Sequence, residues 1–148
     1  VLFGVRRWSK LSEAEEDRLL QATLTKVGLE GVSHLMPSEL SGGMRKRVGI
    51  ARALALNPAV MLYDEPTTGL DPITTYTIDS LIVALRAQLD VTTLLVSHDV
   101  SSVFRTADRI AFLNAGRLAF AGSVEDFKNS GDDDIREIVA KATAEALA

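Results

Sequence analysis

Cysteine is absent from this chain of 148 residues. Its absence excludes a disulfide framework, a zinc site with cysteine ligands and a thiol nucleophile, and it is compatible with a reducing compartment. Long apolar runs are absent as well, because stretches such as 81–85 are far shorter than the roughly 20 residues of a membrane-spanning helix. We therefore expect a folded, water-soluble chain that does not cross a bilayer by itself.

An excess of positive charge is also missing. The formal net charge is −4, so the chain has no general electrostatic reason to bind nucleic acid, which requires a basic face. One predicted helix does carry a basic cluster, formed by Arg45, Lys46, Arg47 and Arg52. Because no aromatic residues are interleaved, the cluster favours a solvated or phosphate-facing surface over a nucleic-acid site.

Two helices are predicted in the first part of the chain. Ser12 and Glu15 have the spacing of a capping box, and apolar residues at helical spacing then predict a helix over about 13–27. A second helix is predicted directly after Gly42 and Gly43, and Asn57-Pro58 ends it.

The remaining pattern is typical of an α/β fold. Short apolar runs at 59–64 and 92–97 predict strands buried on both faces, and the helical pattern of 73–89 between them predicts a βαβ unit with a parallel sheet. Residues 109–122 predict a hairpin around Asn114-Ala115-Gly116. Helices are expected near 100–106, after a cap at Ser123, and over 132–148.

Ser41, Gly42 and Gly43 stand at the start of the second predicted helix. A serine cap followed by two residues without Cβ lets backbone N–H groups approach an anion at the positive end of the helix dipole. Taken alone, the tripeptide favours a flexible turn before a helix over an anion site.

Two carboxylates, Asp64 and Glu65, end the first predicted strand, at the sheet edge where ligands bind in open α/β folds. An aspartate there could hold a hydrated Mg²⁺ that bridges nucleotide phosphates, and the adjacent glutamate could orient and deprotonate a water. The alternative is an acidic turn without a ligand. His98 ends the next strand and could bond a terminal phosphate oxygen, or serve only as a structural residue.

Taken together, the runs LSGGM, VMLYDEP, GLDP and VSHD resemble the ATP-binding subunits of ABC transporters in order and spacing. By this resemblance Leu40–Met44 match the signature motif, Val60–Asp64 the Walker B strand and Glu65 the catalytic glutamate. Gly69–Asp71 match the D-loop, and His98 the switch histidine. The implied fold is a P-loop NTPase core of the ABC ATPase type, truncated at the N-terminus, with part of the helical subdomain.

The resemblance implies ATP and Mg²⁺ as cofactors and a homodimer of nucleotide-binding subunits paired head to tail. Ser41, Gly42 and Gly43 would contact the partner's ATP in trans, Asp71 would lie at the dimer interface, and Asp64 would bind Mg²⁺. Further expectations are an integral-membrane permease partner, no nucleic acid, and a cytoplasmic location on the inner face of the plasma membrane.

A narrower resemblance concerns the transported molecule. Met44 departs from the glutamine that is common at this place, and with the segments KLSEAE and SGDDDIREIV it is similar to the ATPases of Mce or Mla-type phospholipid transport systems. The corresponding regions would be 1–57 for the helical subdomain, 58–122 for the RecA-like core and hairpin, and 123–148 for C-terminal helices.

No phosphate loop of the form Gly-x4-Gly-Lys-Ser/Thr occurs in the 148 residues, and the first residue is not methionine. We therefore expect a C-terminal portion of a longer subunit, which alone exposes apolar strand faces, binds ATP weakly and does not hydrolyse it. A non-catalytic module that docks on a partner ATPase or permease is the alternative. An ATPase of DNA repair or translation fits less well, since those families usually add coiled coils or tandem domains.

Overall fold

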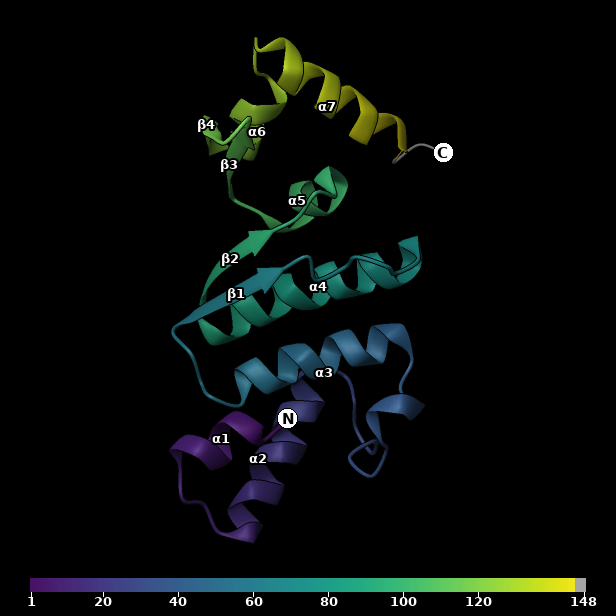
Figure 1. The fold of residues 1–148 in the computed structure, drawn as a ribbon, viewed down its shortest axis with the longest axis vertical. Coiled ribbons are helices and arrows are strands. Elements are labelled where there is room, and N and C mark those ends of the chain that lie inside the picture. The colour runs from purple at the N-terminus through teal and green to yellow at the C-terminus, as the bar shows by residue number, and fades with distance from the viewer. Residues whose placement is uncertain (146–148) are drawn as a thin grey trace. The chain divides into compact units, whose positions relative to one another are not determined.

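The computed structural model describes residues 1–145, which form two compact units: Val1–Leu94, and a second unit that begins at Leu95. Figure 1 shows the order of the elements along the chain. Among the described residues, no helix combines the length and the apolar character needed to cross a membrane. The expected division into 1–57, 58–122 and 123–148 remains a prediction.

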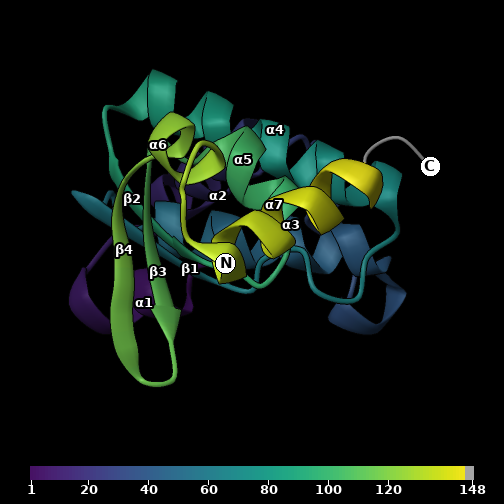
Figure 2. The same ribbon diagram turned by 90° about the horizontal axis from the view of Figure 1, so that it is seen from above.

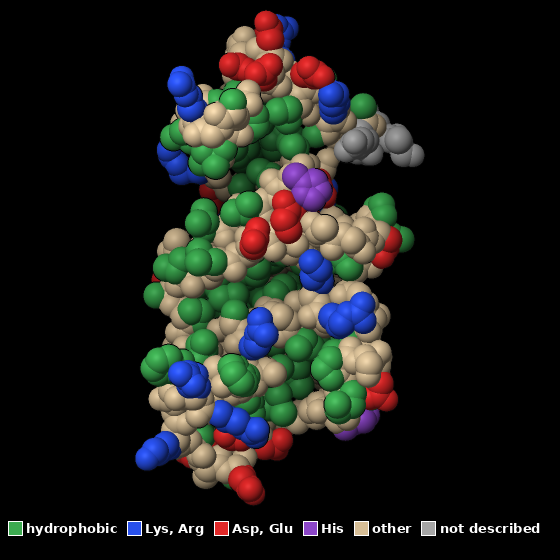
Figure 3. Space-filling view, in the orientation of Figure 1, with side chains coloured by type: hydrophobic (Ala, Val, Ile, Leu, Met, Phe, Trp, Pro, Cys, Tyr) green, Lys and Arg blue, Asp and Glu red, His purple; other side chains and the backbone are tan. Residues whose placement is uncertain are grey.

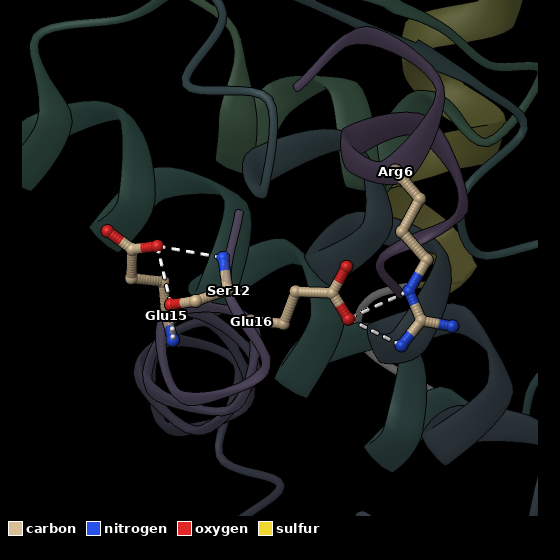
Figure 4. A network of polar contacts seen from close by, with 4 residues as sticks. All are labelled: Arg6, Ser12, Glu15 and Glu16. Atoms are coloured by element: carbon tan, nitrogen blue, oxygen red, sulfur yellow. Dashed lines mark hydrogen bonds and ion pairs between the residues drawn. The ribbon is translucent and has the colours of Figure 1, made fainter. Parts of the chain in front are cut away.

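The first unit begins with α1 (Phe3–Trp8), which the sequence analysis did not predict, and α2 (Glu13–Lys26). A capping box starts α2, because Glu15 N donates to Ser12 Oγ and Ser12 N donates to the Glu15 carboxylate (Figure 4). Arg6 of α1 forms an ion pair with Glu16 of α2. Since Arg6 is largely exposed, this pair contributes little to stability.

Helix α1 depends on contacts distant in the sequence. It has six residues and no side-chain cap, too few for a stable helix by local interactions alone. Its Val5 is 4% exposed and packs in one apolar cluster with Leu2 and Ala55. Tertiary burial therefore explains why this segment is helical.

Helix α3 (Gly42–Leu54) follows the 3-10 turn η1 (Pro37–Glu39). Its start after Ser41 confirms the predicted cap, because Met44 N donates to Ser41 Oγ at 3.2 Å. The helix ends before Asn57, whose φ of 47° lies in the left-handed region that asparagine tolerates better than most residues. Asn57 and Pro58 thus separate α3 from the following strand, as expected.

A strand, a helix and a strand come next: β1 (Val60–Asp64), α4 (Pro72–Leu89) and β2 (Thr92–Val96). The strands are neighbours in a two-stranded sheet. The backbone N–H of Thr92 donates to the carbonyl of Ala59 at 3.2 Å, so both strands start at the same end of the sheet and run parallel (Figure 1). This confirms the predicted βαβ unit.

The prediction that these strands are buried on both faces is wrong for this structure. In β1, Met61 and Tyr63 are buried, whereas Val60 and Leu62 are 52% and 71% exposed. Burial on one face follows the period-2 alternation of a strand. Green hydrophobic side chains reach the surface over the β1 region in Figure 3. The expected exposure of apolar strand faces is therefore confirmed.

The second unit contains a hairpin with helices on either side of it in sequence. Its elements are α5 (Val100–Thr106), β3 (Arg109–Asn114), β4 (Arg117–Ser123), α6 (Val124–Lys128) and α7 (Asp133–Glu145). The antiparallel strands β3 and β4 lie side by side in Figure 2. Ala115 and Gly116, with φ of 48° and 73°, form the tight turn. Of the helix predicted over 132–148, residues 146–148 lie outside the described residues.

An aromatic cluster forms the core of this unit. Phe127 of α6 is 2% exposed. Three rings meet it edge-on with centroid distances of 5.2–6.2 Å, those of Phe104, Phe112 and Phe120. The cap at Ser123 holds α6 at the end of β4, because Asp126 N donates to Ser123 Oγ at 3.0 Å. The sequence predicted this cap but not the ring cluster.

Candidate functional site

The turn at Ser41 is built by helix capping. Its Oγ accepts from Met44 N and its carbonyl accepts from Arg45 N at 2.9 Å. A serine hydroxyl that accepts one hydrogen bond still has a proton to donate. Ser41 is exposed, so its hydroxyl suits a phosphate oxygen brought from outside the chain.

Gly43 has a packing role within the chain. A Cβ added to Gly43 would lie 2.7 Å from Cγ2 of Thr74, and one added to Gly42 would lie 3.5 Å from Cδ2 of Leu70. The first distance is shorter than any normal contact, whereas the second is ordinary. Glycine at position 43 therefore lets the start of α3 approach the start of α4.

Asp64 and Glu65 differ in backbone conformation. Asp64 is the last residue of β1 and is exposed, which fits one carboxylate of a Mg²⁺ site completed by phosphates and water. Glu65 leaves the strand with a φ of 47°, in the left-handed region. The two adjacent carboxylates, for which the sequence suggests different tasks, thus extend from different backbone conformations.

Contacts from two other residues hold Glu65. Thr68 Oγ1 donates to Glu65 Oε2 at 2.8 Å, and Lys46 Nζ donates to the Glu65 carbonyl at 3.0 Å. Sequence reasoning missed both. The three-residue spacing of Thr68 could have indicated its contact, whereas nothing in the sequence pairs Lys46 with a residue 19 positions away.

Asp71 caps α4. Its carboxylate accepts from Thr74 N at 3.0 Å and from the Thr74 hydroxyl. These hydrogen bonds, the one from the hydroxyl first, lower the pKa of Asp71 below its ordinary value. The structure thus gives the predicted D-loop aspartate a local role, and its place at a dimer interface remains a prediction.

His98 lies in the second unit, between β2 and α5, and is exposed. The residues beside it form two local turns. Ser97 Oγ accepts from Asp99 N, and Asp99 Oδ1 accepts from Ser102 N, both at 3.0 Å. The backbone around His98 is thus set by hydrogen bonds on either side.

Within the first unit, the structure brings the predicted signature and Walker B residues to one region. Helix α3 contacts α4 at Gly43 and the turn after β1 through Lys46. A hollow of about 230 Å³ lies between them, lined by Gly42, Arg45, Lys46, Thr68, Gly69 and Leu70. Blue Lys and Arg side chains gather over α3 in Figure 3. Among the described residues, no group of three or more His, Asp or Glu side chains could hold a metal ion.

Comparison with known proteins shows what the chain is similar to. Residues 4–68 match the family model described as ABC transporter. The chain is 44% identical over 126 residues to the methionine import ATP-binding protein MetN of Caulobacter vibrioides, covering 84% of this chain and 38% of the relative. It is 39% identical to the chloroplastic protein trigalactosyldiacylglycerol 3 of Arabidopsis thaliana, covering 82% and 40%. The probable ribonucleotide transport ATP-binding protein Mkl of Mycobacterium leprae is 38% identical, covering 93% and 40%.

Solved structures show the same fold. An ATP-binding cassette of an ABC transporter in its ADP conformation has a TM-score of 0.76 and 27% identity, covering 90% of this chain and 52% of that one. A dimeric cassette in a post-hydrolysis state, bound to ADP and Pi, has a TM-score of 0.67 and 32% identity, covering 79% and 50%. Over the matched residues the chain is homologous to the ATP-binding domains of ABC transporters, and it has the ABC ATPase type of P-loop NTPase fold. The chain spans about 40% of the length of MetN, the Arabidopsis protein and Mkl.

Proposed function

We propose that this sequence supplies the hydrolytic residues of an ATP-binding subunit that energises an ABC transporter. The observation that carries the proposal is the setting of Glu65. It follows the exposed Asp64 at the end of β1, in a left-handed turn that is held from α3 by Lys46. Non-glycine residues in this conformation concentrate at functional sites.

The proposed reaction is ATP hydrolysis. The Glu65 carboxylate would accept a proton from a water whose oxygen attacks the γ-phosphorus, while the bond from that phosphorus to the ADP oxygen breaks. His98 would donate a hydrogen bond to a terminal phosphate oxygen. Mg²⁺, held by Asp64, would neutralise phosphate charge. A phosphate loop outside these 148 residues would hold the nucleotide.

The signature residues Ser41, Gly42 and Gly43 would serve the ATP of a second subunit. Their backbone N–H groups stand at the positive end of α3, and the Ser41 hydroxyl retains a proton to donate. The dimeric cassette bound to ADP and Pi supports a homodimer for this chain too. In that dimer Asp71 would lie at the interface, and residues 1–57, 58–122 and 123–148 would form the helical subdomain, core and C-terminal helices.

For the cargo we propose phospholipid, carried by a permease on whose cytoplasmic side the subunit sits. Support comes from the Arabidopsis relative, which is named for a galactolipid, whereas the name of Mkl specifies ribonucleotide transport. The name of MetN specifies methionine import instead. ATP-dependent lipid transfer between vesicles by the reconstituted subunit and permease tests this assignment. Methionine uptake without lipid transfer would overturn it.

The substitution Glu65→Gln tests the catalytic proposal in a subunit that contains this sequence together with its phosphate loop. Loss of the base should lower kcat by about 10²–10⁴-fold while binding of a fluorescent ATP analogue persists. Glu30→Gln, which changes an exposed loop carboxylate, should retain full turnover. Unchanged turnover in the Glu65→Gln variant would reject the proposal. A wild-type subunit that binds ATP without hydrolysing it would support the alternative, a non-catalytic module that docks on a partner ATPase or permease. The isolated 148-residue chain should show no turnover.

A further inference from the structure

We propose that Lys46 is a positioning residue that holds Glu65 in the conformation needed for catalysis and ties it to the signature helix. The proposal rests on the function proposed above, because it gives Lys46 a role only through Glu65. It concerns the first unit alone, in which both residues lie.

The contact joins a charged donor to a backbone acceptor. Nζ of Lys46, on α3, lies 3.0 Å from the carbonyl oxygen of Glu65, and the contact is partly buried. Hydrogen bonds with a charged partner are stronger than neutral ones, and partial burial limits competition from water. The same carbonyl accepts a longer hydrogen bond of 3.4 Å from Thr68 N. The lysine thus supplies the shorter of these two contacts to the carbonyl.

Local preferences of the chain oppose the conformation that Lys46 holds. Glu65 has a φ of 47°, which is unfavourable for a residue with a Cβ. It also precedes Pro66, and a residue before proline is biased toward extended conformations by contact with the proline ring. Contacts from elsewhere in the fold must therefore maintain the turn.

The carbonyl is the group through which Lys46 can exert this control. Its direction is fixed by the ψ angle of Glu65, so holding the carbonyl also holds the backbone from which the carboxylate extends. Thr68 Oγ1 then holds the carboxylate itself, at 2.8 Å from Oε2. Without Lys46, the turn could relax toward the extended form and carry the carboxylate away from its position.

The same helix connects Glu65 with the signature residues. Lys46 follows Ser41, Gly42 and Gly43 by about one helical turn on α3. A shift of α3 on contact with a partner's nucleotide would therefore move the lysine that holds Glu65. The contact gives the proposed trans site a direct mechanical link to the catalytic residue of its own chain.

The test uses Lys46→Met in the active full-length subunit. Methionine keeps much of the side-chain length but removes the donor. We expect kcat to fall by about 10–100-fold, the size of effect seen when a catalytic group loses its support, with the KM for ATP changed less than about twofold. Lys46→Arg, which keeps a charged donor, should retain most of the wild-type kcat. Arg52→Met, which removes an exposed cation elsewhere on α3, is the control.

A double variant separates positioning from general damage. In a Glu65→Gln background, Lys46→Met should lower the residual rate no further, because the effect passes through Glu65. An equal loss in both backgrounds, or a wild-type rate for Lys46→Met, overturns the inference. If Lys46→Met fails to fold, Lys46→Gln, whose donor is one atom shorter, takes its place with the same expected kcat effect. If Glu65→Gln alone keeps its turnover, the proposed function itself fails.

Discussion

The methyl group of Thr74 occupies the space that a side chain at Gly43 would need: an added Cβ would lie 2.7 Å from Thr74 Cγ2. Thr74 cannot easily turn away, because its side chain is β-branched and its hydroxyl donates to the carboxylate of Asp71. A residue expected to approach a nucleotide is thus also fixed as glycine by the packing of its own chain.

We therefore expect Gly43→Ala to destabilise the protein by about 1–3 kcal/mol, the usual cost of overpacking. Thr74→Ser removes the methyl group and keeps the hydroxyl, so it should recover most of this loss in the double variant. Gly49→Ala is the matched control on α3. Nothing lies within 4 Å of a Cβ at that position, and it should stabilise by about 1 kcal/mol through helix propensity. Urea unfolding gives the free energy of unfolding of the wild type, Gly43→Ala, Gly49→Ala and the double variant. A Gly43→Ala variant as stable as the wild type would contradict the packing argument.

Phe127 is predicted to be the most sensitive position of the second unit. It is 2% exposed and meets three aromatic rings. Phe127→Ala should cost about 3–5 kcal/mol of unfolding free energy through loss of burial and the cavity left behind. Phe3→Ala, at a site 80% exposed, should cost less than about 0.5 kcal/mol. Similar costs for both variants in chemical denaturation would argue against the ring cluster as a core.

Local signals explain which parts of the fold could be predicted. The caps at Ser12, Ser41 and Ser123 act over three residues, and each is found where the sequence placed it. Helix α1 escaped prediction because its formation depends on burial of Val5 beside Ala55, 50 residues away in the sequence. An apolar run specifies which residues tolerate burial, but other segments of the chain decide which faces of a strand are covered. The sequence therefore could not show that β1 is buried on one face only.

The candidate site likewise combines residues that local sequence predicts with contacts that depend on distant parts of the chain. Motif spacing predicts Asp64, Glu65 and the signature turn as candidate site residues, because each motif is a short contiguous run in the sequence. It could not supply the contact between Lys46 and Glu65, which depends on how α3 packs. The left-handed turn at Glu65 was even less accessible, since a glutamate before proline favours extended backbone. The conflict between local preference and observed conformation became visible only in the structure.

The cap at Asp71 predicts a pH dependence. Hydrogen bonds from Thr74 place the pKa of Asp71 below its ordinary value of 3.8 in the folded chain. Folding therefore favours the ionised carboxylate: the contribution is complete above the unfolded pKa and is lost as the pH falls through the lower folded pKa. Asp71→Asn keeps a capping oxygen but does not titrate.

The stability of the wild type relative to Asp71→Asn should accordingly decrease as the pH is lowered from about 6 to below the ordinary aspartate range. Urea unfolding of both proteins at each pH gives this difference. Glu15 and Asp126, whose pKa values are also lowered by hydrogen bonds, titrate in both proteins and cancel. A difference that stays constant, or grows in acid, would show that the carboxylate gains nothing from its cap.

The exposed apolar face of β1 should make the isolated 148-residue chain associate. Val60 and Leu62, at 52% and 71% exposure, lie on the same face of the strand, and contiguous apolar surface on a sheet favours pairing with another molecule. Replacing both by threonine preserves β propensity and removes apolar area. Sedimentation velocity over a concentration series should show association of the wild-type chain and much less of the double variant. Met36→Thr changes a side chain of similar exposure (64%) outside the sheet and should leave association unchanged. Equal association in all three chains would place the contact elsewhere on the molecule.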